Sequence, residues 1–258
     1  MKRKYLTLLL SLVATFSLVA CGNNDDADTG NTDAGDVDGA EVETGEITSI
    51  GLGVAVSLAS SSADEDSAQA QSDATIAGVA FDADGKIVKV IIDTAQNKVP
   101  VTDGVVEAPE GFKTKKELGP EYGMKPASGI DKEWNEQVEF LEEYFVGMTA
   151  EEVMGMEVDE DSYPTNPDVT TGATLKISSY QQAVLNAWEN AVDAEGVETI
   201  GLGVYTDLGH GTKDADDENG AAVQFEDNIA LVGLNADGEV VASQTDVAQN
   251  TVTFTPDG

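Results

Sequence analysis

The chain repeats part of its own sequence at a distance of one domain. The segments TSIGLGVAVS (48–57), FDADGKIVKV (81–90) and DTAQNKV (93–99) return, in the same order, as ETIGLGVYTD (198–207), LNADGEVVAS (234–243) and DVAQNTV (246–252). The offset is 150 residues for the first pair and 153 for the other two. Repeats of solenoid proteins span only about 20–50 residues. This spacing therefore predicts the duplication of a domain-sized unit.

The second copy is shorter than the first, because it stops at Gly258, which corresponds to Val105. We expect a complete domain over residues 47–194 and a partial repeat over 197–258 that holds only the sheet portion. Either the chain is a truncated two-domain protein or the second copy is a degenerate module, and the sequence leaves both open. A sheet without covering helices is marginal. We expect the repeat either to pack against the first domain, through the face of the 178–193 helix, or to be poorly ordered.

Alternating apolar residues in the complete copy predict strands over 47–58, 73–82 and 86–93, with Asp84-Gly85 as a hairpin turn. The GLGV sequence of both copies has a Gly-x-Gly but lacks the third glycine of a dinucleotide site. It indicates a β-bulge or a place where another backbone approaches closely.

The period then changes to that of amphipathic helices. Trp134, Val138, Leu141 and Phe145 form one apolar side, with Asp131 as the expected N-cap. Capping boxes formed by Thr149 with Glu152 and by Ser178 with Gln181 predict two further helices. Strands followed by helices indicate an α+β fold, an antiparallel sheet covered by helices.

The N-terminus has the features of an export signal. Three basic residues precede the apolar stretch YLTLLLSLVATFSLVA, which is followed by Cys21. With 16 residues, the stretch is shorter than the roughly 20 that a membrane-spanning helix needs. Leu18-Val19-Ala20-Cys21 resembles the bacterial lipobox, which implies that residues 1–21 are a lipoprotein signal with Cys21 as the lipidated residue. Ordinary cleavage after Ala20 is the alternative.

Charge limits the partners of the chain. Its formal net charge is −36, which repels nucleic acid and therefore argues against DNA or RNA binding. Residues 22–46 hold nine acidic residues, no basic residue and few large apolar side chains. Such a segment cannot bury enough surface to offset the entropy of ordering, so we interpret it as a flexible acidic tether.

The sequence lacks the sets of residues that form familiar catalytic and metal sites. The single histidine, His210, lies in a polar loop, and Cys21 is the single cysteine, so neither a Ser-His-Asp triad nor a zinc-type metal site is expected. The stretch DVTTGATLKISSYQQ (168–182) is the remaining candidate. Gly172 and Ala173 leave room beside Thr174, whose hydroxyl precedes the start of a helix that favours an anion. A plain turn into a capped helix is the structural alternative.

The residues Asp168-Val169-Thr170-Thr171-Gly172-Ala173-Thr174 resemble the D-x-x-(S/T)-G-A-T motif of FMN-binding domains. In that family a flavin transferase joins FMN, through its phosphate, to the last threonine, which matches Thr174. Thr171 stands where serine is usual and keeps the hydroxyl. Residues 113–153 and 177–191 are also similar to flavinylated, peptide-pheromone-encoding surface lipoproteins of Gram-positive bacteria. The resemblance covers essentially the whole mature chain.

This resemblance implies one covalent FMN, with Asp168, Thr171, Gly172 and Ala173 in the binding motif. Leu175, Tyr122 and Met124 are candidates for contact with the flavin ring, although ordinary core packing explains them as well. The implied protein is a lipid-anchored electron carrier at the extracellular face of the cell membrane. Its partners would be a flavin transferase, a membrane quinone dehydrogenase and an acceptor such as ferric iron. The alternative is a non-redox lipoprotein, either a binding module or a pheromone precursor that releases TFSLVA from its signal peptide.

Overall fold

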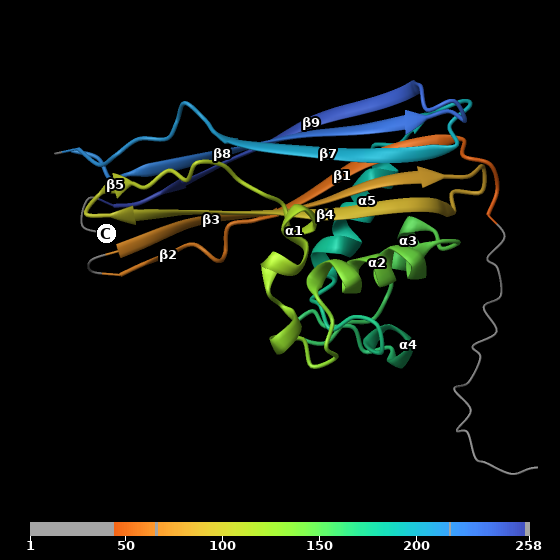
Figure 1. The fold of residues 1–258 in the computed structure, drawn as a ribbon, viewed down its shortest axis with the longest axis horizontal. Helices are drawn as coiled ribbons and strands as arrows, with labels where there is room; N and C mark the ends of the chain where they lie inside the picture. The colour runs from red at the N-terminus through yellow and green to blue at the C-terminus, as the bar shows by residue number, and fades with distance from the viewer. Residues whose placement is uncertain (1–43, 65–66, 217, 256–258) are drawn as a thin grey trace, which may run out of the picture. The chain divides into compact units, whose positions relative to one another are not determined.

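Two antiparallel sheets and a group of helices make up the part of the chain that the computed structural model describes, residues 44–64, 67–216 and 218–255 (Figure 1). These residues belong to one unit, Glu41–Gly258. The expected α+β class, with antiparallel sheets, is confirmed. Cys21, the signal segment and most of the acidic tether lie outside the described residues. Within these ranges, no helix has the length and apolar character needed to cross a membrane.

The first sheet has the strand order β5-β4-β3-β1-β6, and β2 pairs with the outer part of β3. Its strands are β1 (Ser49–Ser57), β2 (Ser62–Ala63), β3 (Ser67–Phe81), β4 (Ile87–Thr102), β5 (Val105–Val106) and β6 (Val192–Asp193). The turn between β3 and β4 has Gly85 at a φ of 76°, and the Asp82 carboxylate accepts hydrogen bonds from the backbone N–H groups of Asp84 and Lys86. The predicted hairpin is confirmed.

β3 and β4 are longer than the sequence pattern indicates. β3 begins at Ser67 rather than at 73, and β4 continues to Thr102 rather than ending at 93. Residues 67–72 (SAQAQS) contain only serine, alanine and glutamine, which gives little apolar signal. They are strand because Ala70 pairs with Val99 and both side chains are buried in an apolar cluster with Phe225 of the second sheet. Tertiary packing therefore extends the hairpin beyond its periodic part.

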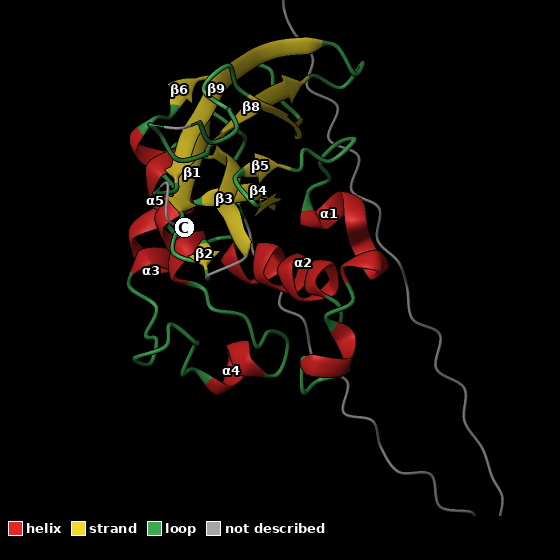
Figure 2. Ribbon diagram, turned by 90° about the vertical axis from the view of Figure 1, so that its left-hand side faces the viewer, coloured by secondary structure: helices red, strands yellow, loops and turns green. Residues whose placement is uncertain are grey.

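The helices lie on one face of the first sheet (Figure 2). They are α1 (Lys115–Leu118), α2 (Trp134–Phe145), α3 (Ala150–Met154), α4 (Pro167–Thr170) and α5 (Ser178–Glu189), with two 3₁₀ helices, η1 (Gly119–Tyr122) and η2 (Lys125–Ala127). The apolar side of α2 is buried as expected, in one core with Phe81, Ile92 and Val184. These helices form the cover that the sequence predicts for the complete copy.

Two of the predicted helix caps are wrong. α2 is capped by Glu133, while Asp131 has a φ of 57° and lies in the turn before it. α5 begins at Ser178, but its N-cap is Ile177 and no side chain caps it. Gln181 cannot close the expected capping box, because its side chain is buried and donates to the carbonyl oxygens of residues 153 and 156. The capping box of Thr149 with Glu152 at the start of α3 is confirmed.

The two glycines of GLGV in β1 admit the backbone of α5. A Cβ atom added to Gly51 would overlap the carbonyl oxygen of Ala187, and one added to Gly53 would overlap that of Ala183. Two asparagines of this part of the chain, Asn186 and Asn190, donate their side-chain amides to the backbone carbonyl oxygens of Val54 and Leu52. Close backbone approach, one of the two expectations for these glycines, is confirmed for β1.

The second sheet consists of β7 (Thr199–Leu208), β8 (Ala222–Leu234) and β9 (Val240–Thr253), in the order β7-β8-β9. Its register follows that of β1, β3 and β4. Ser49 pairs with Phe81, and Thr199 pairs with Leu234, at offsets of 150 and 153 residues. The β-bulge between Ala80 and Phe81 has a counterpart between Gly233 and Leu234. The strands that share sequence thus also share pairing.

The second sheet covers the face of the first sheet that points away from the helices. Ile50, Leu52 and Ile76 of the first sheet form a buried cluster with Ile200, Ile229 and Leu231 of the second. Packing of residues 197–258 against the first domain is therefore confirmed, but the expected contact surface is wrong. Side chains alternate along a strand, so β1 presents Gly51 and Gly53 to α5 and Ile50 and Leu52 to the second sheet.

A buried polar group also joins the two sheets. The Asp227 side chain of β8 is fully buried, and its Oδ1 accepts hydrogen bonds from Thr206 Oγ1 (2.6 Å) and from Asn97 Nδ2 (2.8 Å). Its Oδ2 has no hydrogen-bond partner among the described residues. Burial raises the pKa of the Asp227 carboxyl above its ordinary value of 3.8, because the charged form is the more costly one to bury.

Replacement of Gly53 by alanine should destabilise the fold, whereas alanine at Gly203 in the second sheet should not. The Cβ of Gly53→Ala would overlap the α5 backbone, while a Cβ at Gly203 meets no atom within 4 Å. We expect a loss of about 3 kcal/mol or more for Gly53→Ala and a change within about 0.5 kcal/mol for Gly203→Ala. Urea unfolding of both variants measures this difference. Equal losses would contradict the close approach of α5.

The Asp227→Asn variant should change how stability depends on pH. A raised carboxyl pKa in the folded state contributes stability that is fully present below the unfolded value, near 3.8, and is lost as pH rises through the folded value. Asparagine keeps the acceptor oxygen without a charge. The free energy of unfolding of Asp227→Asn should therefore rise relative to wild type between pH 3.8 and neutrality. A difference that stays constant across urea titrations in this range would contradict the assignment.

Candidate functional site

A cavity of about 300 Å³ lies where β3 and β4 meet the segment that leads into α5. Its wall combines strand residues with residues from the helical side of the domain. It is lined by Asp73, Thr75, Thr94, Gln96, Lys115, Met124, Tyr163, Thr174, Leu175, Lys176, Ser179 and Tyr180. The volume falls at the lower end of the range of small-molecule sites.

The motif residues before Thr174 form a tight turn. Asn166 caps α4 by accepting a hydrogen bond from the backbone N–H of Asp168, and the Thr171 hydroxyl donates to the carbonyl oxygen of Asp168 (3.1 Å). A Cβ added to Gly172 would overlap the ring of Phe140. The neighbouring Ala173 is fully buried. The small residues of the motif therefore let this turn lie against α2, which brings the next residue to the cavity.

Thr174 lines the cavity and is held by hydrogen bonds on its other side. Its backbone N–H donates to Gln137 Oε1 (2.8 Å), and its hydroxyl donates to the carbonyl oxygen of Ser128 (2.7 Å). The hydroxyl oxygen also lies 3.2 Å from Gln137 Oε1. The side chain is only partly buried. Thr174 thus combines a fixed position with access from the cavity.

The strand side of the cavity offers polar groups in a buried wall. The Thr94 side chain is 3% exposed, and its hydroxyl makes no hydrogen bond of good geometry among the described residues, although it interacts with the neighbouring Tyr180 hydroxyl. Gln96 Nε2 donates to Asp73 Oδ1 (2.8 Å). A buried hydroxyl without a partner is costly to leave unsatisfied, since most buried polar groups are hydrogen-bonded. A polar ligand in the cavity would add a hydrogen bond to the contact that Thr94 makes with Tyr180.

Tyr180 contributes a neutral hydroxyl to the same wall. Trp134 Nε1 donates to its oxygen (3.0 Å), so the phenol proton is not used in this contact. Burial raises the pKa of Tyr180 above its ordinary value of 10.0, because the phenolate would lose its hydration. At neutral pH the side chain is therefore a hydrogen-bond donor toward its surroundings.

Two lysines give the cavity a positive character that is unusual for this chain. Lys115 Nζ lies 4.9 Å from the centre of the Tyr122 ring, and Lys176 Nζ lies 5.3 Å from the centre of the Tyr163 ring. The chain has only 13 lysine and arginine residues against 49 acidic ones. Asp73 lines the same cavity, so two cations and one carboxylate leave an excess of one positive charge, which favours an anionic ligand group near the lysines. The contacts of the lysines with aromatic faces restrict where they lie.

The candidate residues fall into two groups, those that line the cavity and those that lie outside its wall. Thr174, Leu175 and Met124 line the cavity. Asp168, Thr171, Gly172 and Ala173 are not among the lining residues and form the turn that carries Thr174. Tyr122 lies behind the wall, where its hydroxyl donates to Gln96 Oε1 (3.4 Å) and its ring packs edge-on against Trp134. Cys21 lies outside the described residues, and His210 is exposed.

Several cavity residues were not identified from the sequence. Asp73 with Thr75, and Thr94 with Gln96, are polar residues two positions apart in β3 and β4, which places each pair on one side of the sheet. That spacing was a usable signal. Gln137 also had a signal, since it follows Trp134 by one helical turn on the apolar side of α2. No sequence signal marked Lys115 or Lys176, because single lysines in loops and short helices are common.

Comparison with known proteins gives one partial similarity. Over 94 residues the chain is 39% identical to a protein named chlorophenol reductase from Desulfitobacterium hafniense, a match that covers 31% of this chain and 28% of that protein. The chain thus spans little more than a quarter of the length of this relative. A scan against known protein families finds no match, and neither does a comparison with solved structures.

Proposed function

We propose that this chain is a cell-surface lipoprotein that carries FMN covalently, through a phosphoester to Thr174, and passes electrons from a membrane quinone dehydrogenase to extracellular acceptors such as ferric iron. The observation that carries the proposal is the position of Thr174. The last residue of a D-x-x-T-G-A-T sequence has its hydroxyl fixed at the wall of a cavity that also holds two lysines.

The residues around the cavity suit a flavin nucleotide. Lys176, two residues after Thr174, and Lys115 offer positive charge for a phosphate group. Thr94 and Tyr180 place two neighbouring hydroxyls at the cavity, and Trp134 does not use the Tyr180 proton. These groups match the carbonyl and N–H groups of a flavin ring, and Leu175 and Met124 offer apolar contact. Bound FMN would supply two-electron uptake and one-electron release, chemistry that the side chains themselves do not provide.

The partial relative is consistent with a redox role, because its name describes a reductase. The matched part of that protein is small, so its activity is not transferred to this chain. We assign this chain the role of an electron carrier rather than that of a stand-alone enzyme. Its proposed partners are a flavin transferase, a quinone-linked electron donor in the membrane and an extracellular acceptor.

The proposed location follows from the N-terminus. Lipidation of Cys21 would hold the protein at the outer face of the cell membrane, and the acidic residues 22–46 would extend the domain away from it. A covalent bond to the cofactor suits that location, because dissociated FMN would be lost from the cell surface.

Substitution of Thr174 should abolish covalent flavin. Thr174→Ala, produced with a flavin transferase in the exported compartment, should lack the flavin mass and the fluorescence of a denatured gel band, while Thr174→Ser should retain both. Thr170→Ala is the matched control, because its hydroxyl bonds to Pro167 and is not part of the cavity. Covalent flavin in Thr174→Ala would refute the attachment site. An unmodified wild-type protein would favour a non-redox lipoprotein.

Substitution of Cys21 should release the protein from the membrane. Wild type should be recovered with membranes and should carry the mass of two or more acyl chains, because a single chain anchors only weakly. Cys21→Ser should lack this mass and should no longer be anchored by lipid. Fractionation and intact-mass measurement test this. Recovery of both proteins entirely from the culture supernatant would contradict lipid anchoring.

A further inference from the structure

Gln137 is a fully buried polar residue with both ends of its side chain engaged. It belongs to α2, and its Oε1 accepts the hydrogen bond from the Thr174 N–H described above. Its Nε2 donates to the carbonyl oxygen of Lys132 (3.1 Å) and lies 3.9 Å from Met124 Sδ. One carboxamide therefore links the helix, the turn before it and the motif threonine.

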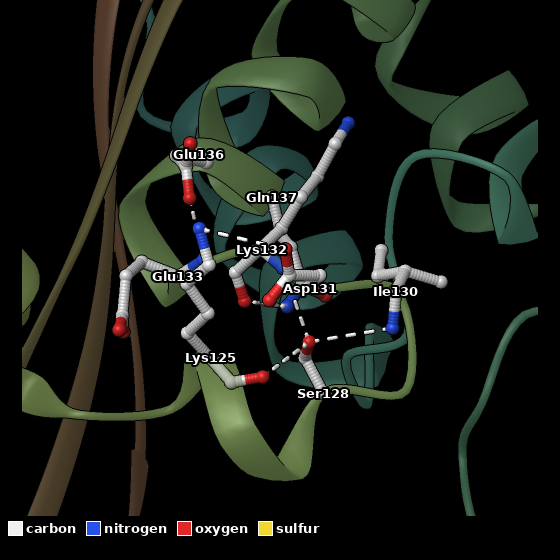
Figure 3. A network of polar contacts seen from close by, with 8 residues as sticks. All are labelled: Lys125, Ser128, Ile130, Asp131, Lys132, Glu133, Glu136 and Gln137. Atoms are coloured by element: carbon white, nitrogen blue, oxygen red, sulfur yellow. Dashed lines mark hydrogen bonds and ion pairs between the residues drawn. The ribbon is translucent and has the colours of Figure 1, made fainter.

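Ser128 fixes the turn that supplies the second contact to Thr174. Its hydroxyl donates to the carbonyl oxygen of Lys125 (3.0 Å) and accepts from the backbone N–H groups of Lys132 (3.2 Å) and Ile130 (3.4 Å). Figure 3 shows this hydroxyl at the centre of the turn, with Gln137 on the helix that follows. The Ser128 carbonyl oxygen, which accepts from Thr174 Oγ1, is thereby held in place.

We propose that Gln137 and the Ser128 turn are positioning elements for flavin transfer, which set the Thr174 hydroxyl as the acceptor oxygen. This inference rests on the proposed function. The hydroxyl has one proton, and both of its neighbours are hydrogen-bond acceptors, so the proton is directed toward them. The lone pairs of Oγ1 then remain available for attack. The N–H contact to Gln137 limits movement of the backbone at the same residue.

The transfer step requires an activated flavin nucleotide. Thr174 Oγ1 attacks the FMN phosphorus of a phosphoric anhydride, a new P–O bond forms, and the P–O bond to the leaving nucleotide phosphate breaks. The hydroxyl proton leaves to a base of the transferase or to water, because a carbonyl and a carboxamide are too weakly basic to keep it. No group is oxidised or reduced. In such a step the geometry of the acceptor matters, since small displacements of a reacting atom lower rates strongly.

The protein contains a matched control for a buried glutamine. Gln181 of α5 is also buried, at 3% exposure, and its Nε2 donates to the backbone carbonyl oxygens of Val153 and Met156. It does not line the cavity. Replacement of either glutamine by methionine removes a buried hydrogen-bonding group of similar size, so both variants should lose stability. Only the Gln137 variant should lose the fixed position of the Thr174 hydroxyl, the proposed acceptor of the flavin phosphate.

The test is the rate of covalent flavin incorporation by a purified transferase, with the flavin dinucleotide as donor. Rates are measured per folded molecule, at a temperature at which the variants remain folded, and kcat and KM are determined for the acceptor protein. We expect Gln137→Met to lower kcat by about 10- to 100-fold, and Gln181→Met to leave it within about twofold of wild type. Equal kcat values for the two variants would overturn the inference and leave Gln137 as core only.

Ser128→Ala provides a second test, at a buried residue that belongs to none of the apolar core clusters. Loss of the hydroxyl frees the turn, and we expect kcat to fall by about two- to tenfold, whereas Thr149→Ala, which removes the cap of α3, should not change it. An unchanged kcat for Ser128→Ala would remove the turn from the inference.

A flavin-independent measurement completes the design. In Gln137→Met the Thr174 amide should exchange with deuterium faster than in Gln181→Met, because its acceptor is gone. Equal exchange would count against positioning by Gln137. Failure of the wild-type chain to take up any flavin would overturn the proposed function and this inference together, whereas uptake by wild type with equal variant kcat values overturns the inference alone.

Discussion

The close approach of α5 to β1 sets the geometry of the domain. Gly51 and Gly53 bring the helix backbone onto the strand, and Asn186 and Asn190 hold it there through the carbonyl oxygens of the strand. The first turn of α5 then places Ser179 and Tyr180 over β3 and β4 at the cavity. A bulkier residue in β1 would lift the helix and open the wall. The position of the cavity therefore depends on two glycines of β1 that do not line it.

Although most of the described acidic residues lie at the surface, three carboxyl groups are largely buried. Burial raises the pKa of Asp93, Glu142 and Asp227, and each accepts hydrogen bonds that limit the rise. Glu142 also pairs with Lys116 at 2.6 Å. The first two lie near the cavity strand, where Asp93 accepts from the N–H of Thr94 (2.7 Å) and Glu142 from that of Ile92 (2.6 Å). Two largely buried acidic residues thus accept hydrogen bonds from the backbone of β4.

The sequence predicted those elements whose signals are local and periodic. The β3–β4 hairpin, the apolar side of α2 and the cap of α3 follow from alternation, from a helical period and from a capping box. The sequence could not predict which surface covers the second sheet, because the residues in that contact lie more than a hundred positions apart in the chain. The hydrogen bond from Asn97 to Asp227 is an example. Of the cavity residues, Thr174, Leu175 and Met124 were predicted from the sequence, all through the motif and the resemblance. The polar wall and the lysines of the cavity come from elements that meet only in the folded chain.

The distant contacts of β1 also affect the order of folding. Its contacts with α5 join residues 132 and 138 positions apart, and the bond between Asn97 and Asp227 joins residues 130 apart. Closing such loops costs entropy before the contacts form, and folds dominated by distant contacts fold slowly. The hairpin of β3 and β4 can form early, but one face stays exposed until the helices pack on it and the other until the second sheet is present. The motif turn therefore acquires its final surroundings late, once α5 has closed onto β1, and a modifying enzyme that requires this geometry would act on the folded domain and not on the emerging chain.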